Sequence, residues 1–162
     1  MKRTVKACCL ILCVLFCAAA CEAAADPSQE FFALLNADRE AAGLQPLKWN
    51  QQLADVAKGR AEDMLQNSYY SHFSRSGQSP VSLLRKAGIQ YAFLNEVIAQ
   101  NYSPEAVRDS FRGSETHWNT LMSPKRTEAG IALVPGSRWG YMAVCLLITP
   151  KPMPAVPVRA EP

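Results

Sequence analysis

Apolar side chains recur with helical spacing through the first part of the chain, with short polar breaks between the stripes. One stripe lies between the favourable helix start Asp26-Pro27 and the helix-ending Gly43. A second, longer stripe lies between a capping Asn50 and Asn67. Two shorter helices, each started by a proline, are predicted over residues 81–87 and 104–112.

The second part of the chain changes to strand-like patterns. Residues 128–134 and 140–149 are predicted to pair as a hairpin, because the link PGSRWG between them is rich in turn formers. Residues 89–99 mix aromatic and β-branched side chains and are predicted to form a strand or turn. Residues 114–122, SETHWNTLM, are expected to form a short helix or turn. Mostly helices followed by an antiparallel pair indicate an α+β fold.

The two ends of the chain do not fit this folded pattern. Three cations in MKRTVK precede 14 uninterrupted apolar residues at 7–20, a run too short to span a bilayer and typical of a secretory signal. Ala18-Ala19-Ala20-Cys21 resembles a bacterial lipobox, so we expect removal of residues 1–20 and lipidation of Cys21. Ordinary cleavage after Ala25 is the alternative. Residues 26–149 then form one domain, followed by a proline-rich tail at 150–162.

Removal of the signal changes both the charge and the cysteine content. Of the 17 basic residues, Lys2, Arg3 and Lys6 leave with residues 1–20, and the remaining 14 balance 14 acidic residues. With no basic stripe left, nucleic acid is not an expected partner. Cys145 becomes the last cysteine beyond Cys21, and its place in YMAVCLLIT predicts a small buried hydrophobe.

Four polar residues, His72, Glu96, His117 and Glu128, lie in predicted loops or near the ends of predicted elements, where functional groups are often displayed. Imidazole can ligate a divalent metal or move a proton near neutral pH, and a neighbouring carboxylate fixes its tautomer. Two such pairs facing one cleft could hold zinc or bond to each other in a ring. The spacing does not show that they meet, so four separate, solvated side chains remain an alternative.

A set of short motifs follows in a fixed order along the chain. They are Asn36 with Arg39, GLQPLKW at 43–49, Ser71-His72, EVIA at 96–99, SETHWNTLM at 114–122 and TEAGIA at 127–132. From about Phe31 to Ile148 they resemble the bacterial branch of the CAP superfamily, which includes cysteine-rich secretory proteins, antigen 5 and pathogenesis-related 1 proteins. The resemblance implies an α–β–α sandwich with a small antiparallel sheet between helices.

The resemblance also implies a cleft lined by two histidines and two acidic residues, here His72, Glu96, His117 and Glu128. His72 and His117 would be the candidate ligands of a divalent metal such as zinc. The main expectation is an exported, lipid-anchored and monomeric domain at the cell envelope. A secreted or periplasmic soluble domain is the alternative. Its cleft would bind a lipid, peptide, glycan, or an envelope or host protein. The alternative is a metal-dependent hydrolase of peptide or cell-wall substrates, with Glu96 or Glu128 activating water.

Overall fold

A computed structural model describes residues 26–152, which form five helices and one four-stranded sheet. The predicted signal, the lipidation candidate Cys21 and most of the proline-rich tail lie outside the described residues. The helices are α1 (Pro27–Ala41), α2 (Gln51–Gln66), α3 (Pro80–Lys86), α4 (Pro104–Arg112) and α5 (Glu115–Leu121). The strands are β1 (Lys48–Trp49), β2 (Tyr91–Asn101), β3 (Glu128–Ser137) and β4 (Gly140–Pro150).

The sheet has the strand order β1-β3-β4-β2. The predicted hairpin is confirmed as β3 and β4, and the segment expected to be strand or turn is the long strand β2, antiparallel to β4. The sheet is not wholly antiparallel, because Lys48 and Trp49 pair with Glu128 and Ala129 in parallel. The sequence shows this two-residue strand only as an extended link, since so short a segment has no periodicity to detect.

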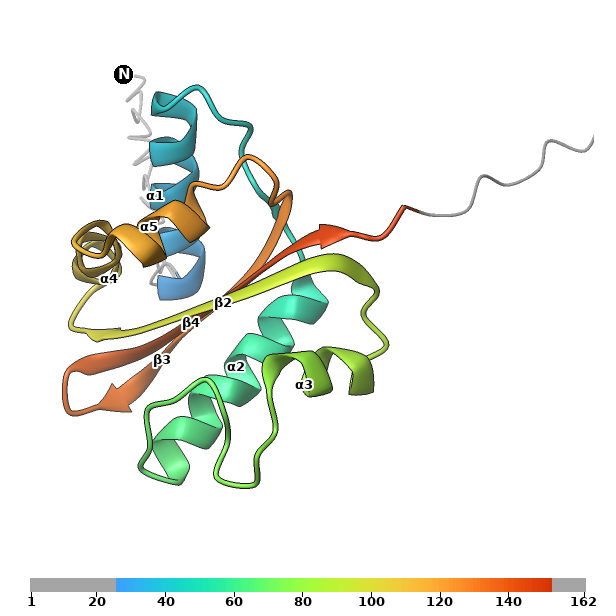
Figure 1. Cartoon of the computed structure of the whole chain (residues 1–162). Coiled ribbons are helices and arrows are strands. Elements are labelled where there is room, and N and C mark those ends of the chain that lie inside the picture. The colour runs from blue at the N-terminus through green and yellow to red at the C-terminus, as the bar shows by residue number, and fades with distance from the viewer. Residues whose placement is uncertain (1–25, 153–162) are drawn as a thin grey trace, which may run out of the picture.

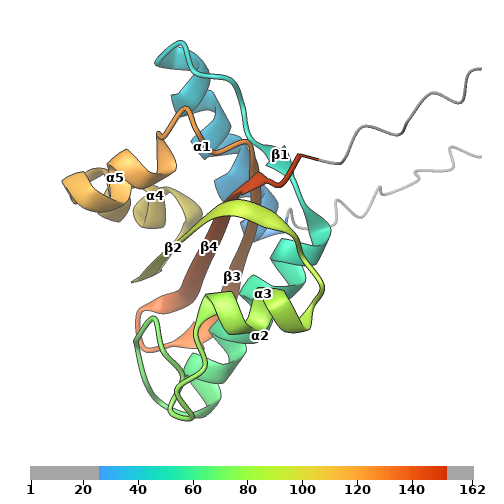
Figure 2. The same ribbon diagram turned by 45° about the vertical axis from the view of Figure 1, so that its right-hand side comes forward.

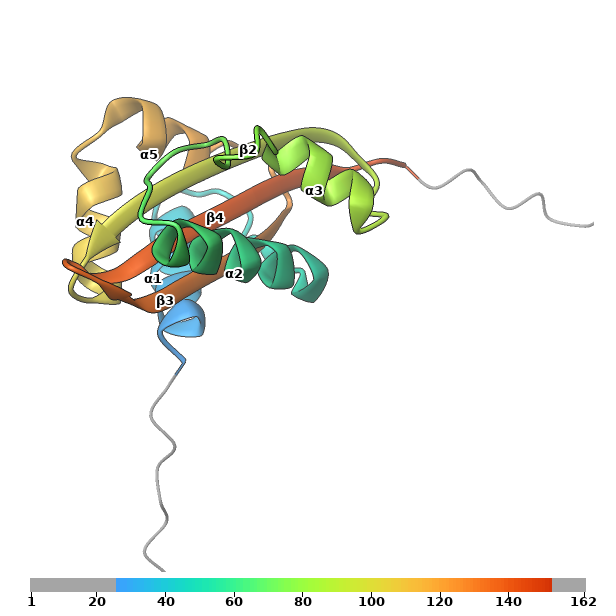
Figure 3. The same ribbon diagram turned by 90° about the horizontal axis from the view of Figure 1, so that it is seen from below.

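The sheet lies between two layers of helices, as the resemblance implied. Helices α1, α4 and α5 cover one face, and α2 and α3 cover the other (Figures 1 and 2). Seen from below, α2 crosses the strands while α3 lies beside β2 (Figure 3). Two buried clusters correspond to these faces, one around Phe31, Val107 and Phe111, and one around Leu53 and Met64. The predicted α+β sandwich is therefore confirmed.

The helix starts follow the local sequence signals. Asp26, Asn50, Ser79 and Ser103 each accept a backbone N–H of the first turn, which satisfies a donor that the helix itself leaves unpaired. Cys145 is fully buried on β4, as predicted, and burial raises the pKa of its thiol. Within residues 26–152, no helix combines the length and the apolar character that a bilayer crossing requires.

A buried arginine joins the first helix to the segment between α5 and β3. Arg39 on α1 is 1% exposed, and burial lowers the pKa of its guanidinium. Its N–H groups donate to the backbone carbonyls of Gln45 (3.0 Å), Leu121 (2.6 Å), Ser123 (3.2 Å) and Arg126 (3.3 Å). Asn36, the other residue of the first motif, exchanges two hydrogen bonds with the backbone of Leu47. Both motif residues therefore hold irregular backbone in place.

We expect Arg39→Met to lower the free energy of unfolding by about 3 kcal/mol, because it leaves the buried Leu121 carbonyl and three part-buried carbonyls without this donor. Urea denaturation of the purified protein measures the change. The control is Arg85→Met on α3, where the side chain is exposed and the expected change is within about 0.5 kcal/mol. Equal stability of the two variants would show that the carbonyls are satisfied without Arg39.

Candidate functional site

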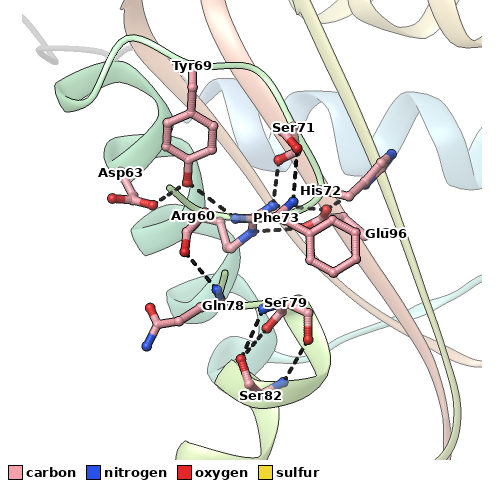
Figure 4. A network of polar contacts seen from close by, with 11 residues as sticks. Arg60, Asp63, Tyr69, Ser71, His72, Phe73, Gln78, Ser79, Ser82 and Glu96 are labelled. Carbon is pink, nitrogen blue, oxygen red and sulfur yellow. Dashed lines mark hydrogen bonds and ion pairs between the residues drawn. The ribbon is translucent and has the colours of Figure 1, made fainter. Parts of the chain in front are cut away.

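His72 and Glu96 meet at the outer edge of β2. His72 lies in the loop between α2 and α3, and Glu96 lies in the middle of β2. The imidazole Nδ1 is 2.7 Å from Glu96 Oε1 (Figure 4). The His72 side chain is 49% exposed, whereas that of Glu96 is 3% exposed. A carboxylate that accepts Nδ1–H fixes the tautomer of a neutral imidazole and leaves the Nε2 lone pair directed at solvent.

Arg60 supplies the charge that allows Glu96 to be buried. Its Nε and Nη2 donate to the two Glu96 oxygens at 3.0 and 3.1 Å, and Nη2 also donates to the Ser71 carbonyl at 2.9 Å. The Arg60 side chain is 1% exposed. A buried carboxylate needs a paired cation with good geometry, and the planar guanidinium offers two parallel donors. Arg60 thus fixes both the carboxylate and the backbone beside His72.

Tyr69 and Asp63 extend this network on the side away from His72 (Figure 4). Arg60 Nη1 lies 3.5 Å from the Tyr69 hydroxyl, which donates to Asp63. Burial, and then the hydrogen bond to Asp63, raise the pKa of Tyr69 to about 12. The Tyr69 hydroxyl therefore stays protonated at neutral pH and connects the end of α2 to the loop that carries His72.

Glu128 lies on the same face of the sheet as Glu96, but on β3 and not on β2. It begins β3, and its Oε2 accepts the side-chain N–H of Asn50, the N-cap of α2, at 2.7 Å. Asn50 and Arg60 are ten residues apart on α2, which corresponds to about 15 Å along the helix. Between them, α2 lies directly on the sheet, since a Cβ placed on Gly130 would be 2.1 Å from the Ala54 nitrogen. Glu128 therefore holds the start of α2, and the helix separates it from Glu96.

His117 lies on the opposite side of the sheet. It belongs to α5, and its ring packs edge-to-face on Phe111 with centroids 5.7 Å apart. Phe111 is part of the buried cluster under α1, α4 and α5. Glu96 is paired with Leu146 of β4, so both side chains lie on the same face of the sheet. Leu146 belongs to the cluster under α2, on the other face from Phe111. Of the four predicted cleft residues, the contacts of the described structure join only His72 and Glu96.

A depression of about 350 Å³ opens beside the His72–Glu96 pair. Its lining is His72, Phe73, Ser79, Pro80, Val81, Leu94, Asn95 and Glu96. Residues 26–152 contain no group of three or more His, Cys, Asp or Glu side chains that could hold a metal ion. Zinc sites in proteins use three or four such ligands, so the described residues do not fit a zinc centre.

The sequence does not directly reveal the role of Arg60 in the site or the contact between Asn50 and Glu128. Arg60 falls within an apolar stripe of α2, in register with Ala57 and Met64, which are buried. A cation at such a position is a signal for a buried partner, because arginine is almost never fully buried unless it is paired. Asn50 was identified as a helix cap, and its second partner Glu128 is 78 residues away, a distance that no local pattern reveals.

Comparisons with known proteins identify the family of the chain. The model of the cysteine-rich secretory protein family, CAP, matches residues 32–147. Two Bacillus subtilis proteins, YkwD and the membrane protein YlbC, are 33% and 34% identical over 108 and 107 residues. Each match covers 65% of this chain, but only 42% and 31% of those proteins. The chain thus spans less than half the length of these curated relatives.

Solved structures show the same fold. An extracellular protein with an SCP domain from Bacillus anthracis has a TM-score of 0.69 and 27% identity, over 76% of this chain and 40% of that one. An outer surface protein from Borrelia burgdorferi has a TM-score of 0.70 over 76% of this chain and 92% of that one. At 19% identity, the second likeness shows the fold alone.

The Arg60–Glu96 pair gives a test by a double-variant cycle. Arg60→Met leaves a buried carboxylate unpaired, and we expect the free energy of unfolding to fall by about 3–5 kcal/mol. The double variant Arg60→Met with Glu96→Met should recover much of this loss, because no buried charge remains. Urea denaturation measures the original protein, Arg60→Met, Glu96→Met and the double variant. Additive losses in the double variant would show that the two side chains do not stabilise each other.

Proposed function

Because the chain belongs to the cysteine-rich secretory protein family, CAP, and to its bacterial type, we propose that it is an exported ligand-binding domain of the cell envelope. The proposed binding site is the depression beside His72 and Glu96. The candidate ligands are those expected for the cleft, namely a lipid, a peptide, a glycan, or an envelope or host protein. A monomer is the proposed state of the domain.

The observation that carries this proposal is a half-exposed imidazole on a rigid, buried support. Glu96 and Arg60 are nearly inaccessible, yet they hold His72 at the surface, where Nε2 is free to meet a ligand. Phe73 and Val81, which are 61% and 43% exposed, line the same depression. A concave site with apolar walls and one oriented polar group is typical of ligand binding.

Export and lipid anchoring are part of the proposal. The charged and apolar start of the chain has the organisation of a secretory signal, and Cys21 is the candidate for lipidation. An extracellular protein with an SCP domain is among the structural relatives, which supports an exported location. Acyl chains on Cys21 would hold the domain at a membrane, whereas ordinary cleavage would release it.

A hydrolase is the second candidate, and one observation favours it. A histidine whose Nδ1 is held by a buried carboxylate is oriented for proton transfer at Nε2. The metal-dependent form of this candidate has less support, because both Glu96 oxygens already accept hydrogen bonds from Arg60 and one also meets His72. A metal-free hydrolase would require His72 to activate water or a substrate hydroxyl.

His72→Ala tests the proposal. We expect this variant to stay folded, with unfolding changed by less than about 1 kcal/mol because the imidazole is half exposed. Binding should be lost, measured by NMR shift changes with envelope peptides, saccharides and phospholipids, each tested separately. His117→Ala is the matched control and should keep binding. Equal loss in both variants would favour the four-residue cleft over the His72 site.

Activity assays with the same compounds separate the two candidates. The binding domain should give no turnover in either the original protein or His72→Ala. Turnover that falls by orders of magnitude in His72→Ala would establish the hydrolase instead. No response of the His72 region to any class of compound would overturn the proposed site.

A further inference from the structure

In the described part of the chain, the large exposed apolar side chains lie on β2 or on segments next to it. In residues 26–152, the exposed large hydrophobic side chains are Tyr70, Phe73, Val81, Phe93, Tyr102 and Trp139. Each of them lies on β2, next to its end, or in the segments beside its outer edge. Single exposed apolar residues scattered over a surface need no explanation, but a row of them indicates an interaction surface.

The far end of this row is a fixed aromatic pair. Tyr102 follows β2, and Trp139 lies in the turn between β3 and β4, with their rings edge-to-face at 6.2 Å. Gly140 holds the turn against Tyr102, because a Cβ there would be 2.8 Å from the Tyr102 Cα. Arg138 lies over the Trp139 ring at 4.8 Å. Rings held in place before a ligand arrives lose little conformational entropy on binding.

A second depression lies beside this aromatic pair. Its volume is about 370 Å³, and it is lined by Tyr70, Gln100, Asn101 and Trp139. Tyr70 is two residues before His72, so one loop borders both depressions. From Leu94 beside His72 to Tyr102, β2 and the following residue extend about 26 Å, at about 3.3 Å per residue. An elongated ligand could contact both ends.

The outer edge of β2 is closed to an added peptide strand. The Tyr70 hydroxyl donates to the Ile98 carbonyl at 2.8 Å, on the side of β2 away from β4. Val97, Ile98 and Ala99 are between 1% and 6% exposed. A peptide that pairs with a strand edge needs free backbone groups along it, and these groups are covered in the middle of β2. Binding must therefore involve side chains.

The lining of the second depression combines aromatic rings with neutral polar groups. Gln100 and Asn101 contribute amides beside Tyr70 and Trp139, and both depressions are open to solvent, unlike an enclosed channel for an acyl chain. A sugar ring presents an apolar C–H face, which stacks on an aromatic ring, and hydroxyl groups, which bond to amides. We propose that a linear glycan binds along β2, from His72 to Trp139. This proposal rests on the proposed function for its His72 end.

Oligomers of β-1,4-linked N-acetylglucosamine, from one to six units, test the proposal by isothermal titration calorimetry with the purified protein. Affinity should rise with length until the oligomer spans both depressions. Trp139→Ala should weaken binding of the six-unit oligomer by about tenfold and leave the two-unit oligomer unchanged. Trp139→Phe, which keeps a stacking ring, should retain most of the affinity. His72→Ala should weaken binding at every length.

The outcomes separate this inference from the proposed function. The proposed glycan site along β2 is wrong if affinity does not depend on oligomer length, or if Trp139→Ala leaves the affinity for the six-unit oligomer unchanged. If His72→Ala still weakens binding in that case, the proposed binding site at His72 stands. If an envelope peptide binds, no saccharide binds, and His72→Ala weakens the peptide binding, the glycan proposal is likewise wrong and the His72 site stands. Binding to phospholipid vesicles that Trp139→Ala abolishes, without saccharide binding, would assign the aromatic pair to a membrane surface and also overturn the inference.

Discussion

The buried pair of Arg60 and Glu96 is the constraint on which the site depends. It connects a helix, a loop and an edge strand that otherwise touch through few polar groups, and it does so where water is excluded. An ion pair in such a place adds little net stability, but losing one member leaves a charge that the interior cannot solvate. Its role is therefore geometric, since it decides where the loop lies and which way the imidazole faces.

The fold could largely be predicted from the sequence, because its helices carry local signals. Caps such as Asn50, stops such as Gly43 and the turn formers before Gly140 act over a few residues, and the structure follows them. The site could be predicted only in part. The motifs point to His72 and Glu96, but the partners of His117 and Glu128 depend on which sheet face each element covers, and this is decided by packing across the whole domain.

His72 and His117 both belong to the motif set of the family, but the described contacts do not bring them together in one site. One imidazole is held at the surface by a carboxylate, and the other rests on an aromatic ring of the core beneath α4 and α5. Likewise, Asn36 and Arg39 belong to the motif set, yet their contacts are with backbone groups. In this family member, motif residues such as Asn36 and Arg39 hold irregular backbone in place, whereas His72 is held at the surface by Glu96.

The contacts of Arg39 also bear on when the domain can fold. Its carbonyl partners in Leu121, Ser123 and Arg126 lie 82 to 87 residues further along the chain, and β1 pairs with the first residues of β3. Contacts of such long sequence separation close late and slow folding. During synthesis, Arg39 can complete these contacts only after the chain has been made as far as Arg126. The junction between α1 and the segment before β3 is therefore one of the later parts of the domain to close.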